Sequence, residues 1–321
     1  QRVWEAREIF QRVGLHHLPV IDDERHLVGI VSHTDLYRAG IDETASMMAA
    51  AALTDAAGST PALGALDRLV VASIIPEQPI PTTAILVARR LGLAAGITAY
   101  DINASCLGFL QALESAAHAI ALGACRRAGV VAVELATLGL NEADAETASL
   151  FGDGAAAVIL AAAAPSENSA ILALRFAAHP EGADLCAIRA GGSRWNIRRP
   201  PADPGDYLFA MQGRRVARFT MEIVPPFLDA LLAGAGVELD RIACLIPHQA
   251  SPLGLQFIQR LVRDSGVHVV DIIRDHGNQV SASLPSGLHA AIASGRLRRG
   301  ELGLLLGSAA GISLGGMVFR Y

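Results

Sequence analysis

The stretch Ile97-Thr-Ala-Tyr-Asp-Ile-Asn-Ala-Ser-Cys-Leu-Gly-Phe109 decides the fold of this chain. Residues 97–102 predict a strand, 103–107 form a turn of small residues that carries Cys106, and the alanine-rich run 108–122 predicts a long helix. Strand, turn and helix in this order are the repeating unit of an α/β protein. Because such a turn can present a side chain in a pocket, Cys106 is the first candidate functional residue.

The same alternation of elements continues on both sides of this unit. We expect strands at 66–75, 130–134, 155–160, 171–176, 242–247, 267–272 and from 302 onward, and helices at 82–91, 214–234, 253–264 and 281–294. Strands that alternate with helices indicate an α/β layered fold. Residues 162–168 are the expected crossing between two parts of that fold.

Composition and charge exclude several classes of protein. The 321 residues are 52% hydrophobic and 18% charged, which is enough to bury one large core or two medium cores. The net charge of −5 offers no basic surface to a nucleic acid, so no nucleic-acid partner is expected. The chain opens without a charged-then-apolar signal segment, and a cytoplasmic location is therefore predicted.

The cysteines point to free thiols. Cys106, Cys125, Cys186 and Cys244 are scattered without paired spacing. This pattern suggests neither a disulfide framework nor a zinc site, so we expect no metal. A reducing compartment fits such thiols best.

One segment has a membrane interpretation that has to be weighed. Residues 302–319 carry no charge over 18 positions, and glycines recur every fourth residue, as in the packing motifs of membrane helices. The sequence Gly-Ser-Ala-Ala-Gly at 307–311 breaks this run into two short apolar pieces. Strand, tight turn and strand is therefore the prediction, and no membrane partner is expected.

Three polar side chains form the candidate catalytic set. Cys106, His248 in Pro-His-Gln-Ala, and Asn278 in His-Gly-Asn each lie where an apolar run gives way to small residues. The thiolate is the nucleophilic form of cysteine, and the N-terminus of the helix at 108–122 is expected to lower the thiol pKa. Each residue also has a structural interpretation, as a small buried cysteine, a core histidine and a turn residue after Gly277.

Five motifs together resemble β-ketoacyl-acyl-carrier-protein synthase III, the condensing-enzyme branch of the thiolase superfamily. They are Tyr100-Asp-Ile-Asn-Ala-Ser-Cys-Leu-Gly-Phe109, Leu150-Phe-Gly-Asp-Gly-Ala-Ala-Ala-Val158, Ile246-Pro-His-Gln-Ala250, Asp275-His-Gly-Asn278 and the glycine-rich run 307–316. The resemblance spans about 40–321, in family order. It implies a thiolase fold, two similar halves in five layers (αβαβα), with the cysteine in 40–165 and the histidine and asparagine in 166–321, and a homodimer.

The resemblance also implies a reaction. An acyl thioester would acylate Cys106, and a malonyl-type thioester would then lose carbon dioxide and attack the acyl group to give a 3-oxoacyl product. His248 and Asn278 would donate hydrogen bonds to the developing enolate, and the backbone amides of Cys106 and Ala310 would form the second oxyanion hole. The substrates would be coenzyme A or acyl-carrier thioesters, with no bound cofactor, in fatty-acid or specialised-metabolite biosynthesis.

The sequence departs from this family at positions that bind coenzyme A or the carrier protein. Thr34 replaces the tryptophan that stacks on adenine, Ala145 replaces a second adenine-contacting arginine, and Leu253 replaces the arginine that docks the carrier. Arg38 alone remains as a candidate for coenzyme A binding. We expect an unusual acyl donor or carrier on an intact chemical core.

Residues 1–39 have a different character. They predict a helix at 3–13 and strands at 17–22 and 27–32, and they resemble the latter part of a CBS domain. In that family a Gly-x-x-Ser/Thr-x-x-Asp element contacts nucleotide, which here implies Gly29, Ser32 and Asp35. This segment stands where a synthase III has its first strand and helix, either as a structural substitute or as a fusion or wrongly assembled boundary.

Two other functions stay open at this point. The same scaffold could load Cys106 and pass the acyl group to an alcohol or amine without decarboxylation. Alternatively, the chain could be a non-catalytic scaffold whose CBS-like segment senses a nucleotide.

Overall fold

The computed structural model describes residues 17–21, 27–32, 44–58, 62–164 and 166–321. The chain divides into two compact units, Gln1–Thr44 and Ala45–Tyr321. In the first unit β1 (His17–Ile21) pairs antiparallel with β2 (Leu27–Ser32), as the sequence predicts. Gly29 and Ser32 lie in β2, opposite Val20 and His17. The predicted helix at 3–13, together with Thr34, Asp35, Arg38 and the boundary at 39–40, lies outside the described residues.

The second unit contains a mixed sheet built around the stretch that carries Cys106. Its strands run in the order β4 (Thr98–Ile102), β3 (Arg68–Ala72), β5 (Arg127–Glu134) and β6 (Gly154–Ala161). The strand β3 is parallel to β4 and β5, and β5 is antiparallel to β6. Parallel strands need crossover helices, which is why helical segments separate these strands in the sequence.

A second sheet repeats this arrangement and extends it by one strand. Its order is β11 (His268–Val269), β10 (Ile242–Pro247), β12 (Leu302–Ala309), β13 (Ser313–Arg320) and β7 (Ala170–Ala178). The first three strands are parallel, and the last two pairings are antiparallel. Among the described residues no strand lies beside β6 at the place that β7 takes beside β13. The replacement of that strand by residues 1–39 stays a prediction.

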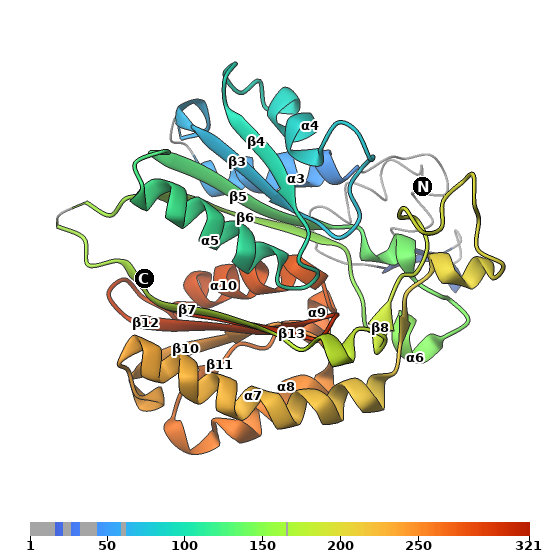
Figure 1. Cartoon of the computed structure of the whole chain (residues 1–321). Coiled ribbons are helices and arrows are strands. Elements are labelled where there is room, and N and C mark those ends of the chain that lie inside the picture. Colours follow the sequence, from blue (N-terminus) through green and yellow to red (C-terminus); the bar gives the residue numbers. More distant parts are fainter. Residues whose placement is uncertain (1–16, 22–26, 33–43, 59–61, 165) are drawn as a thin grey trace. The chain divides into compact units, whose positions relative to one another are not determined.

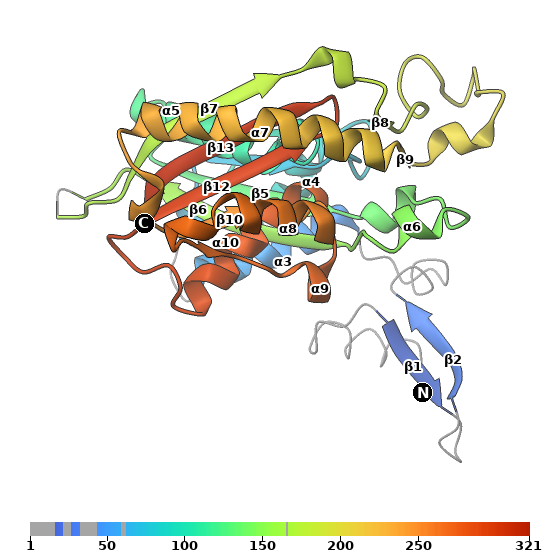
Figure 2. The same ribbon diagram turned by 90° about the horizontal axis from the view of Figure 1, so that it is seen from below.

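Helices separate and cover the two sheets, giving five layers (Figure 1). The outer layer on the first sheet consists of α3 (Ala45–Ala57) and α4 (Thr83–Arg90). The middle layer, between the sheets, consists of α5 (Gly108–Ala121) and α10 (Ser283–Ala293). The outer layer on the second sheet consists of α7 (Gly213–Ala235) and α8 (Pro252–Leu261). Figure 2 shows α7 and α8 side by side over the second sheet. The predicted αβαβα arrangement is confirmed.

Short elements complete the described chain. They are α6 (Ala145–Ala148), α9 (Ile273–His276), the paired strands β8 (Cys186–Ala187) and β9 (Ala210–Met211), and the 3-10 turns η1 (Leu63–Ala65), η2 (Ala136–Gly139), η3 (Pro180–Gly182), η4 (Pro204–Tyr207), η5 (Leu239–Arg241), η6 (Arg263–Ser265) and η7 (Val280–Ala282).

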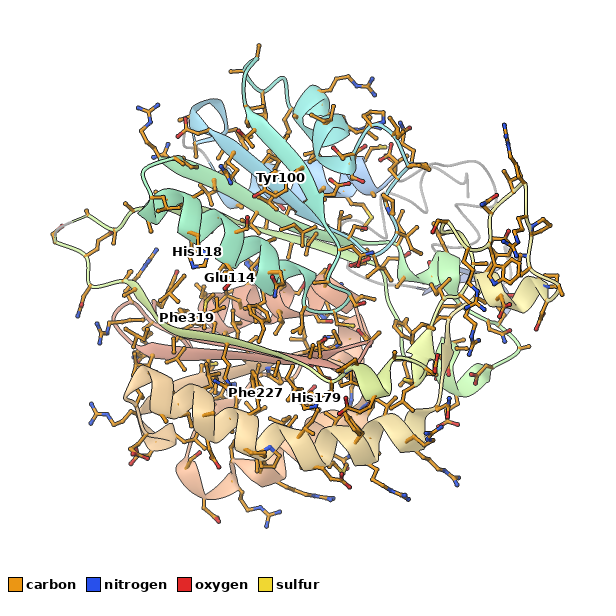
Figure 3. All side chains as sticks on the ribbon, in the orientation of Figure 1. Tyr100, Glu114, His118, His179, Phe227 and Phe319 are labelled. Carbon is orange, nitrogen blue, oxygen red and sulfur yellow. The ribbon has the colours of Figure 1, made fainter. Side chains whose placement is uncertain are left out.

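Three apolar clusters fill the spaces between the layers. The central one contains the fully buried Phe109 and Leu110 of α5 and Leu284 of α10. The others lie under α3 with α4 and under α7 with α8. Figure 3 shows Phe319 of β13 on the side facing the middle helices, and Phe227 of α7 on the opposite side of the sheet. Each fully buried large side chain contributes about 1.5–3 kcal/mol.

The glycines at 303, 307 and 315 serve close packing of strands, and Gly311 serves a turn. A Cβ on Gly303 would lie 2.5 Å from the Phe319 ring, and one on Gly307 would lie 3.0 Å from Leu107 Cδ2. Gly311, at φ +129°, makes the turn between β12 and β13. The predicted strand, turn and strand are thus confirmed. Within the described part of the chain, no helix is long and apolar enough to cross a membrane.

Candidate active site

Cys106 lies in the turn that joins β4 to α5. The turn is tight because Ser105 takes the left-handed conformation, at φ +50°, which is uncommon for a residue with a side chain. Asn103 supports it, since its Oδ1 accepts a hydrogen bond from the Ser105 N–H at 3.1 Å. The Gly108 N–H then donates to the Ser105 carbonyl at 2.9 Å as α5 begins. Backbone strain of this kind clusters at functional sites.

The electrostatics of Cys106 correct one prediction. Burial raises the pKa of its thiol to about 12, with further contributions from Glu134 and Cys186. The backbone N–H groups of Cys106 and Ala310 point at the thiol and oppose this shift, but they do not outweigh burial. The expectation that the helix N-terminus leaves Cys106 with a lowered pKa is therefore wrong. In the free protein the residue is a neutral thiol.

His248 follows the last residue of β10. Its backbone N–H donates to the Leu306 carbonyl of β12 at 2.8 Å, which fixes the residue at the end of two parallel strands. The side chain is buried, and its Nδ1 has no hydrogen-bond partner among the described residues. Burial lowers the pKa of the imidazole to about 4, so His248 is neutral at physiological pH.

Hydrogen bonds fix both the nitrogen and the oxygen of the Asn278 side-chain amide. Its Nδ2 donates to the Ala250 carbonyl at 3.2 Å, and its Oδ1 accepts from the Val280 N–H at 2.9 Å. The backbone N–H of Asn278 donates to the Leu150 carbonyl at 2.7 Å. Among the described residues the second N–H of this amide has no partner within the loop and can act on a ligand.

The structure brings the three predicted catalytic residues to one place. A Cβ added to Gly307 would lie 3.0 Å from Leu107 Cδ2 and 3.2 Å from His248 Cβ, so β12 passes between the nucleophile turn and the histidine. The link from Asn278 to Ala250 joins the asparagine to the same histidine loop. All three loops meet at the carboxyl ends of parallel strands, where α/β proteins bind ligands.

Gly277 has a backbone conformation that the asparagine turn requires. Its φ of +66° and ψ of −168° fall in a region used essentially by glycine alone, and a Cβ would lie 3.0 Å from three backbone atoms of residues 150–152. We expect Gly277→Ala to destabilise the fold by about 1–3 kcal/mol and to lower the melting temperature by a few degrees.

Calorimetry of Gly277→Ala beside Gly266→Ala tests this expectation. Gly266 also has a positive φ, of +76°, but a Cβ there would meet nothing within 4 Å. The control should therefore melt closer to the wild type. Equal melting temperatures for the two variants would contradict the account of crowding at Gly277.

Two of the predicted docking positions, Ala145 and Leu253, lie on the surface of the described part of the chain. Ala145 begins α6, and Leu253, in the first turn of α8, is 53% exposed. An exposed loop carries Arg194 and Arg199, whose guanidinium carbons lie 5.6 and 5.0 Å from the centre of the Trp195 ring. The described residues contain no cluster of three or more His, Cys, Asp or Glu side chains that could hold a metal ion.

Glu134 is a site residue absent from the predicted set. It ends β5, is 1% exposed, and accepts hydrogen bonds from Ser281 Oγ and the Ile74 N–H. Burial raises the pKa of this carboxyl group to about 8. An acidic residue closing an otherwise apolar strand was the signal in the sequence, because a carboxyl group is rarely buried without a partner.

Comparisons with known proteins agree with this geometry. Residues 100–180 match the family model described as 3-Oxoacyl-[acyl-carrier-protein (ACP)] synthase III, residues 232–321 match the model of the C terminal part of that synthase, and residues 1–42 match a CBS domain. Xanthomonas campestris OleA structures, with a TM-score of 0.74 and 21% identity, share the fold.

Three relatives illustrate the similarity. Beta-ketoacyl-[acyl-carrier-protein] synthase III 3 of Streptomyces coelicolor is 35% identical over 78% of this chain and 74% of its own length. Acetoacetyl CoA synthase NphT7 of a Streptomyces species is 36% identical over 85% and 82%. The crystal structure of 3-oxoacyl-[acyl-carrier-protein] synthase III from Aquifex aeolicus superposes with a TM-score of 0.76, at 29% identity, over 87% of this chain and 85% of that one. The chain therefore belongs to the 3-oxoacyl-[acyl-carrier-protein] synthase III family, whose members are acyltransferases with a thiolase fold.

Proposed function

We propose that this protein is a condensing enzyme that takes an acyl group onto Cys106 and joins it to a malonyl-type thioester with loss of carbon dioxide. The observation that supports this most strongly is the enclosure of the Cys106 thiol by the backbone amides of Cys106 and Ala310, beside the loops of His248 and Asn278. Together these groups pair a nucleophile with hydrogen-bond donors for two oxyanions.

In the first half-reaction the Cys106 sulfur attacks the carbonyl carbon of an acyl thioester. Because the thiol is neutral at rest, its proton has to leave as the carbon–sulfur bond forms. The neutral imidazole of His248 can accept that proton and return it to the departing carrier thiolate. The amides of Cys106 and Ala310 stabilise the tetrahedral oxyanion.

In the second half-reaction the malonyl-type thioester loses carbon dioxide and becomes an enolate. An N–H of neutral His248 and an N–H of Asn278 donate to the enolate oxygen, which stabilises the charge as it forms. The enolate carbon attacks the acyl carbonyl, the bond to sulfur breaks, and the 3-oxoacyl thioester departs. The Cys106 thiolate then takes up a proton, which completes the cycle.

The acyl donor is a coenzyme A or acyl-carrier thioester in this proposal. Relatives bear names for both kinds of chemistry, a synthase of acyl-carrier-protein substrates and a synthase of acetoacetyl CoA. Ala145 and Leu253 bring no positive charge to the positions where the family usually docks these carriers. We infer weaker electrostatic docking and an assembly as a homodimer, with activity in the cytoplasm.

The stoichiometry of the reaction tests this function. We expect incubation with acyl and malonyl thioesters of both carriers to release one carbon dioxide for each 3-oxoacyl thioester formed, measured by carbon-14 release and mass spectrometry. Omitting the acyl donor should reduce both signals together. Acyl loading on Cys106 without carbon dioxide release would overturn the condensing function and favour the non-decarboxylating acyltransferase.

A further inference from the structure

Glu134 connects the two halves of the fold directly beside the active site. It lies at the carboxyl end of β5 in the first sheet, whereas its partner Ser281 belongs to η7, just before α10 in the second half. Both side chains are buried, at 1% and 0% exposure. Burying a carboxyl group destabilises a fold unless hydrogen bonds satisfy its oxygens. A buried carboxyl group at this place therefore points to a role in the geometry or in the chemistry of the site.

One set of contacts leads from Glu134 to the nucleophile turn. The Ile74 N–H donates to both carboxyl oxygens, at 3.1 and 3.3 Å. The Ile74 carbonyl in turn accepts from Asn103 Nδ2 at 3.3 Å. Asn103 Oδ1 accepts from the Ser105 N–H, which precedes Cys106. The position of the carboxyl group is thereby coupled to the turn that presents the thiol.

A second set of contacts leads to the asparagine. Ser281 Oγ hydrogen-bonds to the carboxyl group, and the neighbouring Val280 holds Asn278 Oδ1 through its N–H at 2.9 Å. Val280 has a φ of +51°, a strained value for a β-branched residue that surrounding contacts must maintain. Ser281 also packs on the start of α5, since a Cβ on Gly108 would lie 3.3 Å from its Cβ.

The charge of Glu134 acts on the nucleophile as well. Its negative form raises the pKa of the Cys106 thiol, because like charges in a buried site repel. Three titratable groups lie near this pair. The Asp153 carboxylate acts on Glu134 and accepts two hydrogen bonds from Thr137, and the thiol of Cys186 acts on Cys106. The imidazole of His248, beside the nucleophile turn, stays neutral from pH 6.5 to 9.5 because burial lowers its pKa to about 4.

We propose that Glu134 is a positioning residue of the condensing reaction, which holds the nucleophile turn and the Asn278 turn together and whose ionisation restrains thiolate formation at Cys106. This inference rests on the proposed function. In the uncharged form the carboxyl group keeps both turns in place without opposing the thiolate. In the charged form it keeps them in place but makes the thiol harder to deprotonate.

Alkylation of Cys106 by iodoacetamide tests the electrostatic part without any acyl substrate. Rates are measured from pH 6.5 to 9.5 by peptide mass spectrometry, in a Cys186→Ala background that removes the neighbouring thiol. With Glu134 intact in this background, the alkylation rate should rise tenfold per pH unit at first. Above pH 8 it should rise less steeply, because burial raises the pKa of Glu134 to about 8 and its charged form then opposes the thiolate. A straight line of unit slope for this protein would overturn the proposal even if no variant folds.

Substitutions separate charge from position. Glu134→Gln should alkylate at the wild-type rate at pH 6.5 and several-fold to about tenfold faster at pH 9.5, because one pKa unit of the thiol changes the thiolate concentration tenfold. Glu238→Gln makes the same change at an exposed carboxylate and should follow the wild type. If the ratio of the alkylation rates of Glu134→Gln and the wild type is the same at every pH, the charge of Glu134 does not act on the thiol and its role is structural alone.

Condensation kinetics test the positioning part. At pH 7 we expect Glu134→Gln to keep kcat within about threefold of the wild type, because the amide occupies the same space and keeps an acceptor for the Ile74 N–H. Glu134→Ala should lose about tenfold or more in kcat with little change in KM for the acyl donor, since the turns lose their common partner. Wild-type kcat in Glu134→Ala would overturn the positioning role, whereas absence of condensation in the wild type itself would instead reject the proposed function.

Discussion

Replacing Cys106 by alanine is expected to abolish acyl loading and to reduce condensation by more than about 10³-fold. The substitution removes the sulfur that the backbone N–H groups of Cys106 and Ala310 surround, while leaving those amides in place. The test is intact-protein mass spectrometry after incubation with a panel of acyl-coenzyme A and acyl-carrier thioesters. The wild type should gain the mass of one acyl group, and the variant should gain none.

Cys125→Ala is the matched control for this experiment. Cys125 is also a free cysteine, but it is buried, 4% exposed, in the apolar cluster between the layers, whereas Cys106 is half-buried. Its variant should load an acyl group as the wild type does, with a loss of stability only. Because the thioesters in the panel differ in their carrier, the donor that loads Cys106 also identifies the carrier that the enzyme accepts. An adduct that persists in Cys106→Ala would place the nucleophile elsewhere.

Most of the architecture can be predicted from the sequence because apolar runs and amphipathic segments alternate clearly. The strand at 242–247 has the predicted bounds, and the helix at 108–122 ends one residue earlier, at Ala121. The order of the layers, by contrast, came from the family resemblance, since periodicity does not say which sheet a strand joins. Local pattern and family resemblance therefore supplied different parts of the fold.

The elements that escaped prediction have physical reasons. The helix α3 (Ala45–Ala57) consists almost entirely of small and apolar residues, so it shows no polar face from which a helix could be inferred. The strand predicted at 267–272 shortens to His268–Val269, because a strand at the edge of a sheet pairs on one side only. Residues 281 and 282 belong to a 3-10 turn that precedes the helix Ser283–Ala293.

The candidate site was predictable in its residues but not in its electrostatics. Cys106, His248 and Asn278 are distinguished by their motifs, and the structure gathers their loops. Their catalytic roles stay predictions until variants are measured. The pKa values depend instead on burial, which only the packed structure fixes: it raises the pKa of the Cys106 thiol, the reverse of the sequence-based expectation. Glu134 escaped for the same reason, because its importance comes from contacts distant in the sequence.

The site combines a thiol that resists deprotonation with a histidine that resists protonation. Both properties follow from the same buried environment, which disfavours any charge. Such a site suits a reaction in which charge appears only briefly, on an oxyanion or enolate, at a point surrounded by fixed N–H donors.

His248→Ala is the second substitution with a large expected effect. Decarboxylation and condensation should fall by about 10²–10³-fold, the usual loss when one donor to a developing oxyanion is removed. Acyl loading of Cys106 should continue, though more slowly if the imidazole also carries the thiol proton. Loading is measured by intact mass and decarboxylation by release of labelled carbon dioxide, so the two half-reactions are scored separately.

The pH dependence of the wild type gives an independent check on His248. Burial lowers the pKa of its imidazole from 6.5 to about 4, so the neutral form, which donates one N–H and keeps one lone pair, persists well below pH 6.5. Decarboxylation should therefore show no loss with a midpoint near pH 6.5. The unfolded chain, in contrast, binds a proton near pH 6.5, so His248 should lower the stability of the fold as the pH falls from 6.5 towards 4.

His289→Ala provides the matched control, since His289 is an exposed histidine on α10. It should keep the wild-type rates of both half-reactions. His248→Ala should instead lose decarboxylation and also become less sensitive to acid between pH 6.5 and 4, because the group that resists protonation is gone. Full decarboxylation by His248→Ala would mean that Asn278 and the surrounding backbone carry the enolate alone.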